Sequence, residues 1–261
     1  MNVAVCVKQI PDPAEPSALD ASTHTLVREG KLVLDDSDSY GVEMALQLVE
    51  TSGGGDVILI SMAPNNETSG LRTALAMGAA SAVLVSDPLL KGSDALGTAK
   101  VLAAAIRTLE PAPELVLTAT ESTDGYTGTT PVQLAELLGW PSVTFAKHVE
   151  VGDGSVKVQR QTEAGYDEVT SPLPAVVSVT AGVVEPRYPS FKGIMAARSK
   201  PVSEHTVSSL GLTQDEVGFS GARQAVVSVQ AAEARSGGEI VIDEGEAHER
   251  IVAFLEQIKV L

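Results

Sequence analysis

The sequence predicts an α/β protein with a doubly wound, mostly parallel sheet, followed by an antiparallel meander and a C-terminal extension. Short apolar runs alternate with helical segments through the first half of the chain, as in repeated βα units with right-handed crossovers. The runs are continuously apolar, which is typical of parallel strands covered by helices on both faces. The expected strands are residues 3–7, 57–60, 82–85 and 115–117.

Apolar residues spaced by three and four positions predict the helices between these strands. The segments are residues 42–49, 71–75 and 96–106, and Ser93 is expected to cap the third. The first crossover, residues 11–38, is long. Its two apolar stretches flank Arg28-Glu-Gly30, which predicts a small hairpin at residues 25–34.

The pattern changes after Trp140, where apolar and polar residues alternate between glycine-containing turns. This predicts an antiparallel meander at residues 143–170 and a buried strand at residues 175–179 that returns to the sheet. Residues 202–245 are turn-rich and acidic, and a closing helix is expected near residues 246–259. We therefore divide the chain into an α/β domain, residues 1–201, and an arm, residues 202–261, that packs on a partner. A disordered linker with its helix docked back on the core is the alternative.

Composition and charge exclude several classes of protein. The 261 residues carry a formal net charge of −16, whereas a domain that binds nucleic acid needs a broad basic face. Cys6 is the single cysteine, so no intramolecular disulfide can form, and the four histidines lack ligand spacing, so we expect no metal. No apolar run is long enough to span a bilayer, and the chain enters a strand pattern at once, which leaves no room for a signal peptide. We expect a cytoplasmic protein.

Ligands of open α/β sheets bind beyond the carboxyl ends of the strands, near the switch in strand order. The richest segment at that edge is residues 119–130, a loop that leads into a helix opened by Pro131, with Thr130 expected at the N-cap. Free N–H groups at such a helix start favour a phosphate, and a self-capped start without a ligand is the alternative. The hydroxyl donors and flexible positions of the loop are Thr127, Thr129, Thr130, Gly125 and Gly128.

Carboxylates near this edge suit a sugar or a base better than a phosphate. Asp124 would repel a phosphate, so a ribose hydroxyl is its natural partner. Asp35, Asp36 and Asp38 precede the helix at residues 42–49, where capping uses one carboxylate and the helix dipole tolerates a second. These three aspartates could therefore accept hydrogen bonds from the donors of a ribose or an adenine. No serine lies in a nucleophile elbow and no histidine pairing is indicated, so we expect no catalytic residues.

One stretch departs from the acidic composition, because no acidic residue lies between Pro186 and Lys200. It interleaves basic residues with large apolar ones, a combination typical of a contact surface, with a merely solvated loop and helix as the alternative. The residues concerned are Arg187, Tyr188, Phe191, Lys192, Ile194, Met195, Arg198 and Lys200.

Five motifs resemble, in their order along nearly the whole chain, the β subunit of electron-transfer flavoprotein. They are Val7-Lys-Gln-Ile-Pro-Asp12, Arg72-Thr-Ala-Leu-Ala-Met-Gly78, Ser122-Thr-Asp-Gly125, Glu185-Pro-Arg-Tyr188 and Gly193-Ile-Met195. The resemblance implies a Rossmann-like fold of the adenine-nucleotide α-hydrolase type, and a heterodimer with an α subunit that holds most of a redox-active FAD. The β subunit would bury a structural AMP. Electrons would pass from flavin dehydrogenases, typically the acyl-CoA dehydrogenases of fatty acid oxidation, to a quinone oxidoreductase.

The resemblance also implies positions for the two sites. The AMP site maps onto the main chain around Cys6, Asp35, Asp36, Ser37, Asp38, Met62, Ala119, Ser122, Asp124, Gly125, Thr127, Gly128, Thr129 and Thr130. Of these, Asp124 and residues 127–130 are the expected contacts. The recognition loop maps onto residues 184–200, with Phe191 as the apolar anchor that enters the dehydrogenase.

The sequence departs from the family pattern in both sites. In the nucleotide pocket, Asp35-Asp36 replaces the usual Asn-Pro and Tyr126 replaces a frequent acidic residue. In the recognition loop, Val184 replaces the usual Asn, and the lysine run is diluted to Ala197-Arg-Ser-Lys200, which indicates a different partner from the usual one. Electron-bifurcating relatives place a second FAD where others keep AMP, so that alternative stays open. A stand-alone adenine-nucleotide sensor of similar fold is the other alternative.

Overall fold

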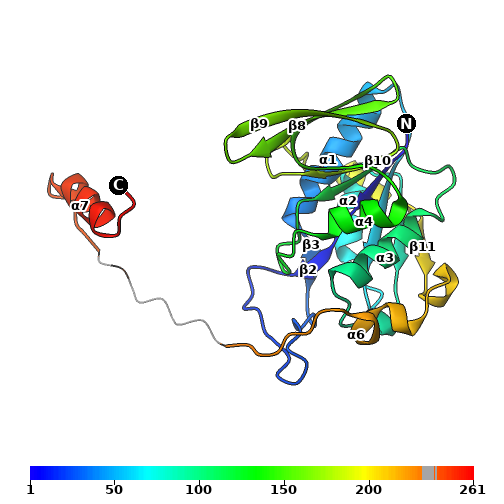
Figure 1. The fold of residues 1–261 in the computed structure, drawn as a ribbon, viewed down its shortest axis with the longest axis horizontal. Coiled ribbons are helices and arrows are strands. Elements are labelled where there is room, and N and C mark those ends of the chain that lie inside the picture. The colour runs from blue at the N-terminus through cyan, green and yellow to red at the C-terminus, as the bar shows by residue number, and fades with distance from the viewer. Residues whose placement is uncertain (231–237, 239) are drawn as a thin grey trace. The chain divides into compact units, whose positions relative to one another are not determined.

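The computed structural model describes residues 1–230, 238 and 240–261 (Figure 1). The chain divides into two compact units, Met1–Val226 and Val227–Leu261, which we describe separately. The first unit is built on a nine-stranded sheet with the order β11-β5-β4-β1-β6-β10-β7-β8-β9. Its strands are β1 (Val3–Cys6), β4 (Val57–Met62), β5 (Ser81–Val85), β6 (Leu115–Ala119), β7 (Ser142–Gly152), β8 (Ser155–Thr162), β9 (Gly165–Pro172), β10 (Ala175–Val179) and β11 (Val202–His205).

The sheet is doubly wound and mostly parallel, which confirms the predicted fold class. The chain proceeds from β1 through β4 to β5 on one side, and then crosses to β6 on the other side of β1. The switch in strand order therefore lies between β1 and β6, whose carboxyl ends mark the edge where such sheets bind ligands. The four predicted strands of the first half all lie in this parallel region.

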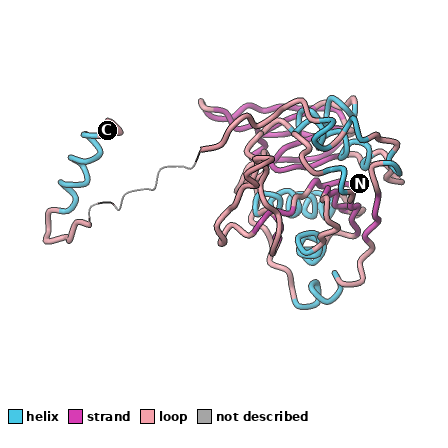
Figure 2. Tube along the Cα trace, turned by 90° about the horizontal axis from the view of Figure 1, so that it is seen from below, coloured by secondary structure: helices cyan, strands magenta, loops and turns pink. Residues whose placement is uncertain are grey.

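Helices cover both faces of the sheet (Figure 2). The helices α1 (Asp36–Thr51) and α2 (Ser69–Met77) pack in one apolar cluster, and α3 (Ala95–Ile106) and α4 (Thr130–Leu138) pack in the other. Strand β1 shows the division, because Val3 and Val5 belong to the first cluster while Ala4 and Cys6 belong to the second. Each fully buried valine contributes about 1.5–3 kcal/mol to folding.

The start of α3 corrects one prediction. Its N-cap is Asp94, whose carboxylate accepts a hydrogen bond from the Gly97 amide at 2.8 Å, so Ser93 is not the cap. The Ser93 hydroxyl instead donates to the Leu90 carbonyl at 2.8 Å and accepts from the Gly218 amide at 2.8 Å. A carboxylate suits an N-cap better than a hydroxyl that already has two other partners.

The long first crossover does not form the predicted hairpin at residues 25–34. Instead β2 (Gln9–Pro11) pairs antiparallel with β3 (Leu32–Leu34), and Leu26 bridges to Leu19. The reason is tertiary, because β3 packs against α2 at Gly70. A Cβ on Gly70 would lie 2.9 Å from the Leu34 amide nitrogen, so this close approach requires glycine.

The predicted meander is confirmed. Strands β7, β8 and β9 form an antiparallel ribbon at one edge of the sheet, where β8 and β9 are labelled in Figure 1. Strand β10 returns between β6 and β7. All five residues of β10 are buried, as expected for an internal parallel strand.

The first unit extends beyond the predicted boundary after residue 201. Residues Val202–His205 form β11, which pairs in parallel with β5 at the edge of the sheet. Short helical turns follow up to Val226: η2 (Ser208–Leu210), η3 (Gln214–Glu216) and α6 (Gly218–Gly221). The remaining short elements of this unit are η1 (Pro88–Leu90) and α5 (Phe191–Ala197).

The second unit contains the predicted closing helix, α7 (Ala247–Gln257). Its apolar residues Ile251 and Phe254 are exposed, as is its C-cap Ile258, and no described residue of this helix is buried. Residues 231–237 and 239 of the predicted turn-rich region lie outside the described residues. Among the described residues, no helix has the length and apolar character needed to cross a membrane.

Candidate functional site

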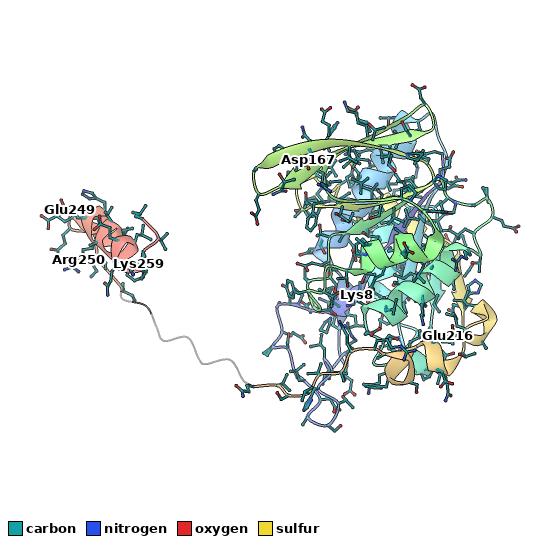
Figure 3. All side chains as sticks on the ribbon, viewed as in Figure 1. Lys8, Asp167, Glu216, Glu249, Arg250 and Lys259 are labelled. Carbon is teal, nitrogen blue, oxygen red and sulfur yellow. The ribbon has the colours of Figure 1, made fainter. Side chains whose placement is uncertain are left out.

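Three segments meet at the carboxyl edge beside the switch between β1 and β6. They are the residues that follow β1, the start of α1, and the loop of residues 119–130 between β6 and α4. Lys8, which follows β1, is labelled in Figure 3. Met62 ends the neighbouring strand β4 at the same edge, and Cys6 and Ala119 end β1 and β6. The predicted nucleotide residues are therefore brought to one edge of the sheet.

Asp35 ties the start of α1 to the loop of residues 119–130. It is fully buried and is the N-cap of α1, where it accepts hydrogen bonds from the Ser37 amide at 3.1 Å and the Ser37 hydroxyl at 2.6 Å. Its other oxygen accepts from the Thr123 amide at 2.8 Å and the Thr123 hydroxyl at 3.1 Å. Asp35 thus organises the edge, and its carboxylate is already fully engaged by protein donors.

Asp38, in the first turn of α1, is also buried. Its Oδ2 accepts a hydrogen bond from the Lys8 amide at 2.6 Å. Burial, and then the nearby negative charge of Asp35, raise the pKa of Asp38 well above the usual range of an aspartate. Asp36, in contrast, is exposed to solvent.

Cys6 contributes only its main chain to this edge. Burial, and then the charge of Asp38, raise the pKa of its thiol, so a reactive thiolate is disfavoured.

Asp124 lies between two cations. Its Oδ1 is 2.6 Å from Lys8 Nζ, and its Oδ2 is paired with Arg28 Nη2. Burial alone would raise the pKa of Asp124, but Lys8 and Arg28 together outweigh this effect and hold the pKa below the usual value. The Lys8 ammonium also donates to the Ser122 hydroxyl at 3.2 Å.

The end of the loop differs by one residue from the prediction. Helix α4 begins at Thr130, so the N-cap is Thr129, and no side-chain cap bond is made there among the described residues. The first amide groups of α4 are therefore left without a side-chain acceptor. Gly128 has a φ of +64°, a left-handed conformation that favours glycine. The helix ends, as predicted, at Gly139.

Two buried polar atoms in the elements of this edge make no hydrogen bond within the described residues. Among the described residues, Ser61 Oγ near the end of β4 and Gln133 Oε1 in the first turns of α4 are buried without a hydrogen-bond partner. An orphaned buried polar atom is costly unless a ligand or water satisfies it. Gln133 Oε1, beside the uncapped start of α4, fits a polar ligand such as a nucleotide, whereas Ser61 lies on the face of the sheet that α1 and α2 cover.

The segment of residues 184–200 forms a second candidate site. Ser190 caps α5 by accepting from the Gly193 amide at 3.0 Å, and the large side chains around it point to solvent. Tyr188 is 93% exposed and Phe191 is 81% exposed. We call the exposed residues the docking surface: Tyr188, Phe191, Lys192, Ile194, Met195 and Arg198.

The two other basic residues of this segment make internal contacts. Arg187 donates from Nε to Glu43 Oε2 at 2.6 Å and from Nη1 to Glu50 Oε1 at 2.9 Å. Lys200 donates to the carbonyls of Leu75 and Ala79 at 2.9 and 2.6 Å, and burial lowers its pKa. Their geometry gives both residues a structural role at the two ends of the segment, although both were predicted to meet a partner.

A mostly apolar groove of about 430 Å³ lies between α2 and the docking surface. It is lined by Arg72, Thr73, Ala76, Tyr188, Pro189, Ile194, Ala197 and Arg198. Helix α5 approaches α2 very closely, because a Cβ on Gly193 would lie only 2.4 Å from the Ala76 carbonyl oxygen.

Sequence reasoning missed three residues that organise these sites. Arg28 was assigned to a turn, Thr123 was seen only as part of a motif, and Glu43 was hidden within an amphipathic helix. Glu43 had one available signal, since a glutamate between Val42 and Met44 on a helix otherwise apolar at that face needs a cationic partner.

A doubly wound parallel sheet, with a helix-opening loop at its switch point, defines the class of α/β proteins that hold a ligand at the carboxyl edge. A family model described as "Electron transfer flavoprotein domain" matches residues 23–210. The chain belongs to the electron transfer flavoprotein family and is of the β-subunit type.

Relatives along the full length support this assignment. The electron transfer flavoprotein subunit beta of Mycobacterium bovis is 39% identical over 265 residues, which cover 100% of this chain and 99% of the relative. That of Mycobacterium leprae is 38% identical with the same coverage. The caffeyl-CoA reductase-Etf complex subunit CarD of Acetobacterium woodii is 33% identical over 242 residues, 92% of each chain.

Proposed function

We propose that this chain is the β subunit of a heterodimeric electron carrier in the cytoplasm. The carrier accepts electrons from flavin dehydrogenases, such as acyl-CoA dehydrogenases, and passes them to a quinone oxidoreductase. An α subunit holds most of the FAD, whose isoalloxazine supplies the redox chemistry. This chain supplies a wall near the flavin, a structural nucleotide site and a docking surface, without catalytic residues of its own.

The observation that carries the nucleotide site is the uncapped start of α4 at the switch between β1 and β6. Its free amide groups and positive dipole end suit the phosphate of AMP. The loop hydroxyls of Thr127 and Thr129 are exposed beside them. Cys6 and Ala119 would contribute only main chain, because their side chains are buried.

The nucleotide content of the co-purified heterodimer tests this proposal. We expect one FAD and one AMP to be released on denaturation of the dialysed complex. A colourless preparation that binds AMP or ATP without flavin would instead indicate a stand-alone nucleotide sensor. A complex that contains neither flavin nor nucleotide would contradict the proposal altogether.

Electron bifurcation is the second candidate, with a second FAD in place of AMP. The observation that favours it is Asp35-Asp36, which stands in the predicted nucleotide pocket where the family usually has Asn-Pro. Two FAD per heterodimer and reduction of the flavin by NADH would select this candidate over the simple carrier.

We further propose that the second unit packs on the α subunit. Its helix α7 exposes an apolar stripe that includes Ile251, Phe254 and Ile258, within a segment too short to bury them by itself. In this proposal the docking surface around Phe191 is the part of the chain that meets the dehydrogenase.

A further inference from the structure

The Asp124 carboxylate is the meeting point of two chain segments that are distant in sequence. Its side chain is 6% exposed, and each of its oxygens faces a different cation. Lys8 comes directly from the end of β1, while Arg28 comes from the long crossover between β2 and β3. The Arg28 guanidinium also donates from Nη1 to the Gln9 carbonyl at 3.3 Å, so it connects β2 with the loop of residues 119–130.

These contacts fix one end of the loop of residues 119–130, and Asp35, the N-cap of α1, fixes the same stretch. Thr123 is held by Asp35 through its amide and its hydroxyl, and the next residue, Asp124, is held by Lys8 and Arg28. Residues 125–129 then turn into α4 from a fixed starting point, through the left-handed Gly128. Each oxygen of Asp124 already accepts from a cation and the side chain is 6% exposed, so a ribose hydroxyl has little access to this carboxylate.

We propose that Arg28 is a positioning residue for the nucleotide site, and that Asp124 is its counter-ion and not a ribose ligand. The inference rests on the proposed nucleotide-binding function and reassigns one residue within it. Arg28 and Lys8 hold Asp124, Asp124 holds the loop, and the loop presents the start of α4 to the nucleotide. Binding of AMP thereby becomes dependent on a residue of the crossover segment.

The crossover contains its own matched control. Lys31 also pairs with an aspartate, Asp12, at 2.8 Å, but its side chain is 68% exposed and the pair lies within the crossover itself. Such exposed pairs contribute little to stability. Lys31→Gln therefore removes one positive charge from the same segment without touching the loop.

The test measures the affinity of the nucleotide-depleted heterodimer for AMP and for 2′-deoxy- and 3′-deoxy-AMP. We expect Arg28→Gln and Asp124→Asn each to weaken AMP binding about tenfold or more, as for loss of a buried charged hydrogen bond. The double variant should lose no more than Asp124→Asn alone, because Arg28 acts through its contact with Asp124. Arg28→Lys should recover part of the affinity, and Lys31→Gln should match the wild type.

The deoxynucleotides separate the counter-ion from a ribose ligand. In the counter-ion role, Asp124→Asn weakens AMP and both deoxynucleotides by the same factor. The inference would be overturned if Asp124→Asn lost the preference for AMP over a deoxynucleotide while Arg28→Gln kept the wild-type affinity for AMP.

Amide hydrogen exchange of residues 122–125 gives a second readout that needs no nucleotide. We expect faster exchange in Arg28→Gln than in Lys31→Gln, since the loop loses one of its anchors. If the wild-type complex binds no AMP, the proposed nucleotide function fails while this measurement still decides the positioning role. Equal exchange in the two variants would refute it.

Discussion

Arg187 and Glu43 are joined by a two-pronged ion pair, with Arg187 Nε 2.6 Å from Glu43 Oε2 and Nη2 3.0 Å from Oε1. The Glu43 side chain is only 4% exposed, on a helix packed against the central sheet. The contact therefore joins Arg187, near the beginning of residues 184–200, to the core of the first unit.

Removal of the Arg187 charge should destabilise the protein. We expect Arg187→Met to lower the free energy of unfolding by about 3 kcal/mol, because Glu43 is left as a buried charge without its cation. Chemical denaturation at neutral pH measures the change. Lys157→Ala is the control: it breaks a pair with Glu168 in which both side chains are more than half exposed, and we expect it to change stability little. Equal losses in the two variants would contradict the structural role of Arg187.

The same ion pair predicts a dependence of stability on pH. Burial would raise the pKa of Glu43, but hydrogen bonds from Arg187 and Gln47 outweigh burial and lower it. A lowered folded-state pKa gives stability that is present above the unfolded-state pKa, about 4.3, and lost as the pH falls through the folded-state value. The difference in unfolding free energy between the wild type and Arg187→Met should therefore shrink in acid. A difference that stays constant between neutral pH and strongly acidic pH would count against this origin.

Phe191→Ala should impair the proposed docking without disturbing the nucleotide. A large, 81% exposed aromatic on a capped helix has the character of an interface hot spot, whose removal costs about 2 kcal/mol, roughly 30-fold in affinity. Stopped-flow reduction of the heterodimer by its dehydrogenase measures the effect, and released nucleotide is measured in parallel. Tyr166→Ala removes another exposed aromatic, on β9, and should leave the kinetics unchanged. Equal slowing by both variants would argue against a specific anchor.

Gly193→Ala should displace α5 from α2. Its new Cβ would lie 2.4 Å from the Ala76 carbonyl oxygen, which is main chain and cannot turn away. We expect a loss of about 1–3 kcal/mol in stability, as for other overpacking changes, together with slower electron acceptance. Gly152→Ala is the matched control, because its added Cβ would meet no atom within 4 Å. Unchanged stability and unchanged kinetics in Gly193→Ala would show that α5 shifts without consequence.

The apolar stripe of α7 should be needed for the heterodimer. Ile251→Asp combined with Phe254→Asp places charge on the exposed apolar stripe and should reduce the yield of co-purified α subunit several-fold. Ala253→Asp, on the opposite side of the same helix, tests whether added charge alone has this effect. If the double variant still co-purifies at the wild-type level, α7 does not contact the α subunit.

Local patterns predicted the sheet well, because its strands are continuously apolar or regularly alternating over their whole lengths. The hairpin at residues 25–34 was wrong because Leu32 and Leu34 pair with Gln9 and Pro11, and no local signal distinguishes this partner from a nearer one. The loop at residues 119–130 and the helix that follows it were predicted from composition and the helix-start signal, and their role in nucleotide binding stays a prediction. The ion pairs made by Arg28 and Arg187 were not predicted, because each joins residues about 100 or more positions apart.

Anchors at both ends of residues 187–200 have a kinetic consequence for the proposed docking of redox partners. Arg187 is fastened to α1 and Lys200 to the carbonyl end of α2, so the exposed side chains between them sit on an already ordered backbone. An encounter with another flavoprotein then requires little further loss of backbone entropy. Complexes formed by such a surface can associate and dissociate rapidly, even though the surface is small. A shuttle that must leave one redox partner before meeting the next requires this combination of fast arrival and short residence.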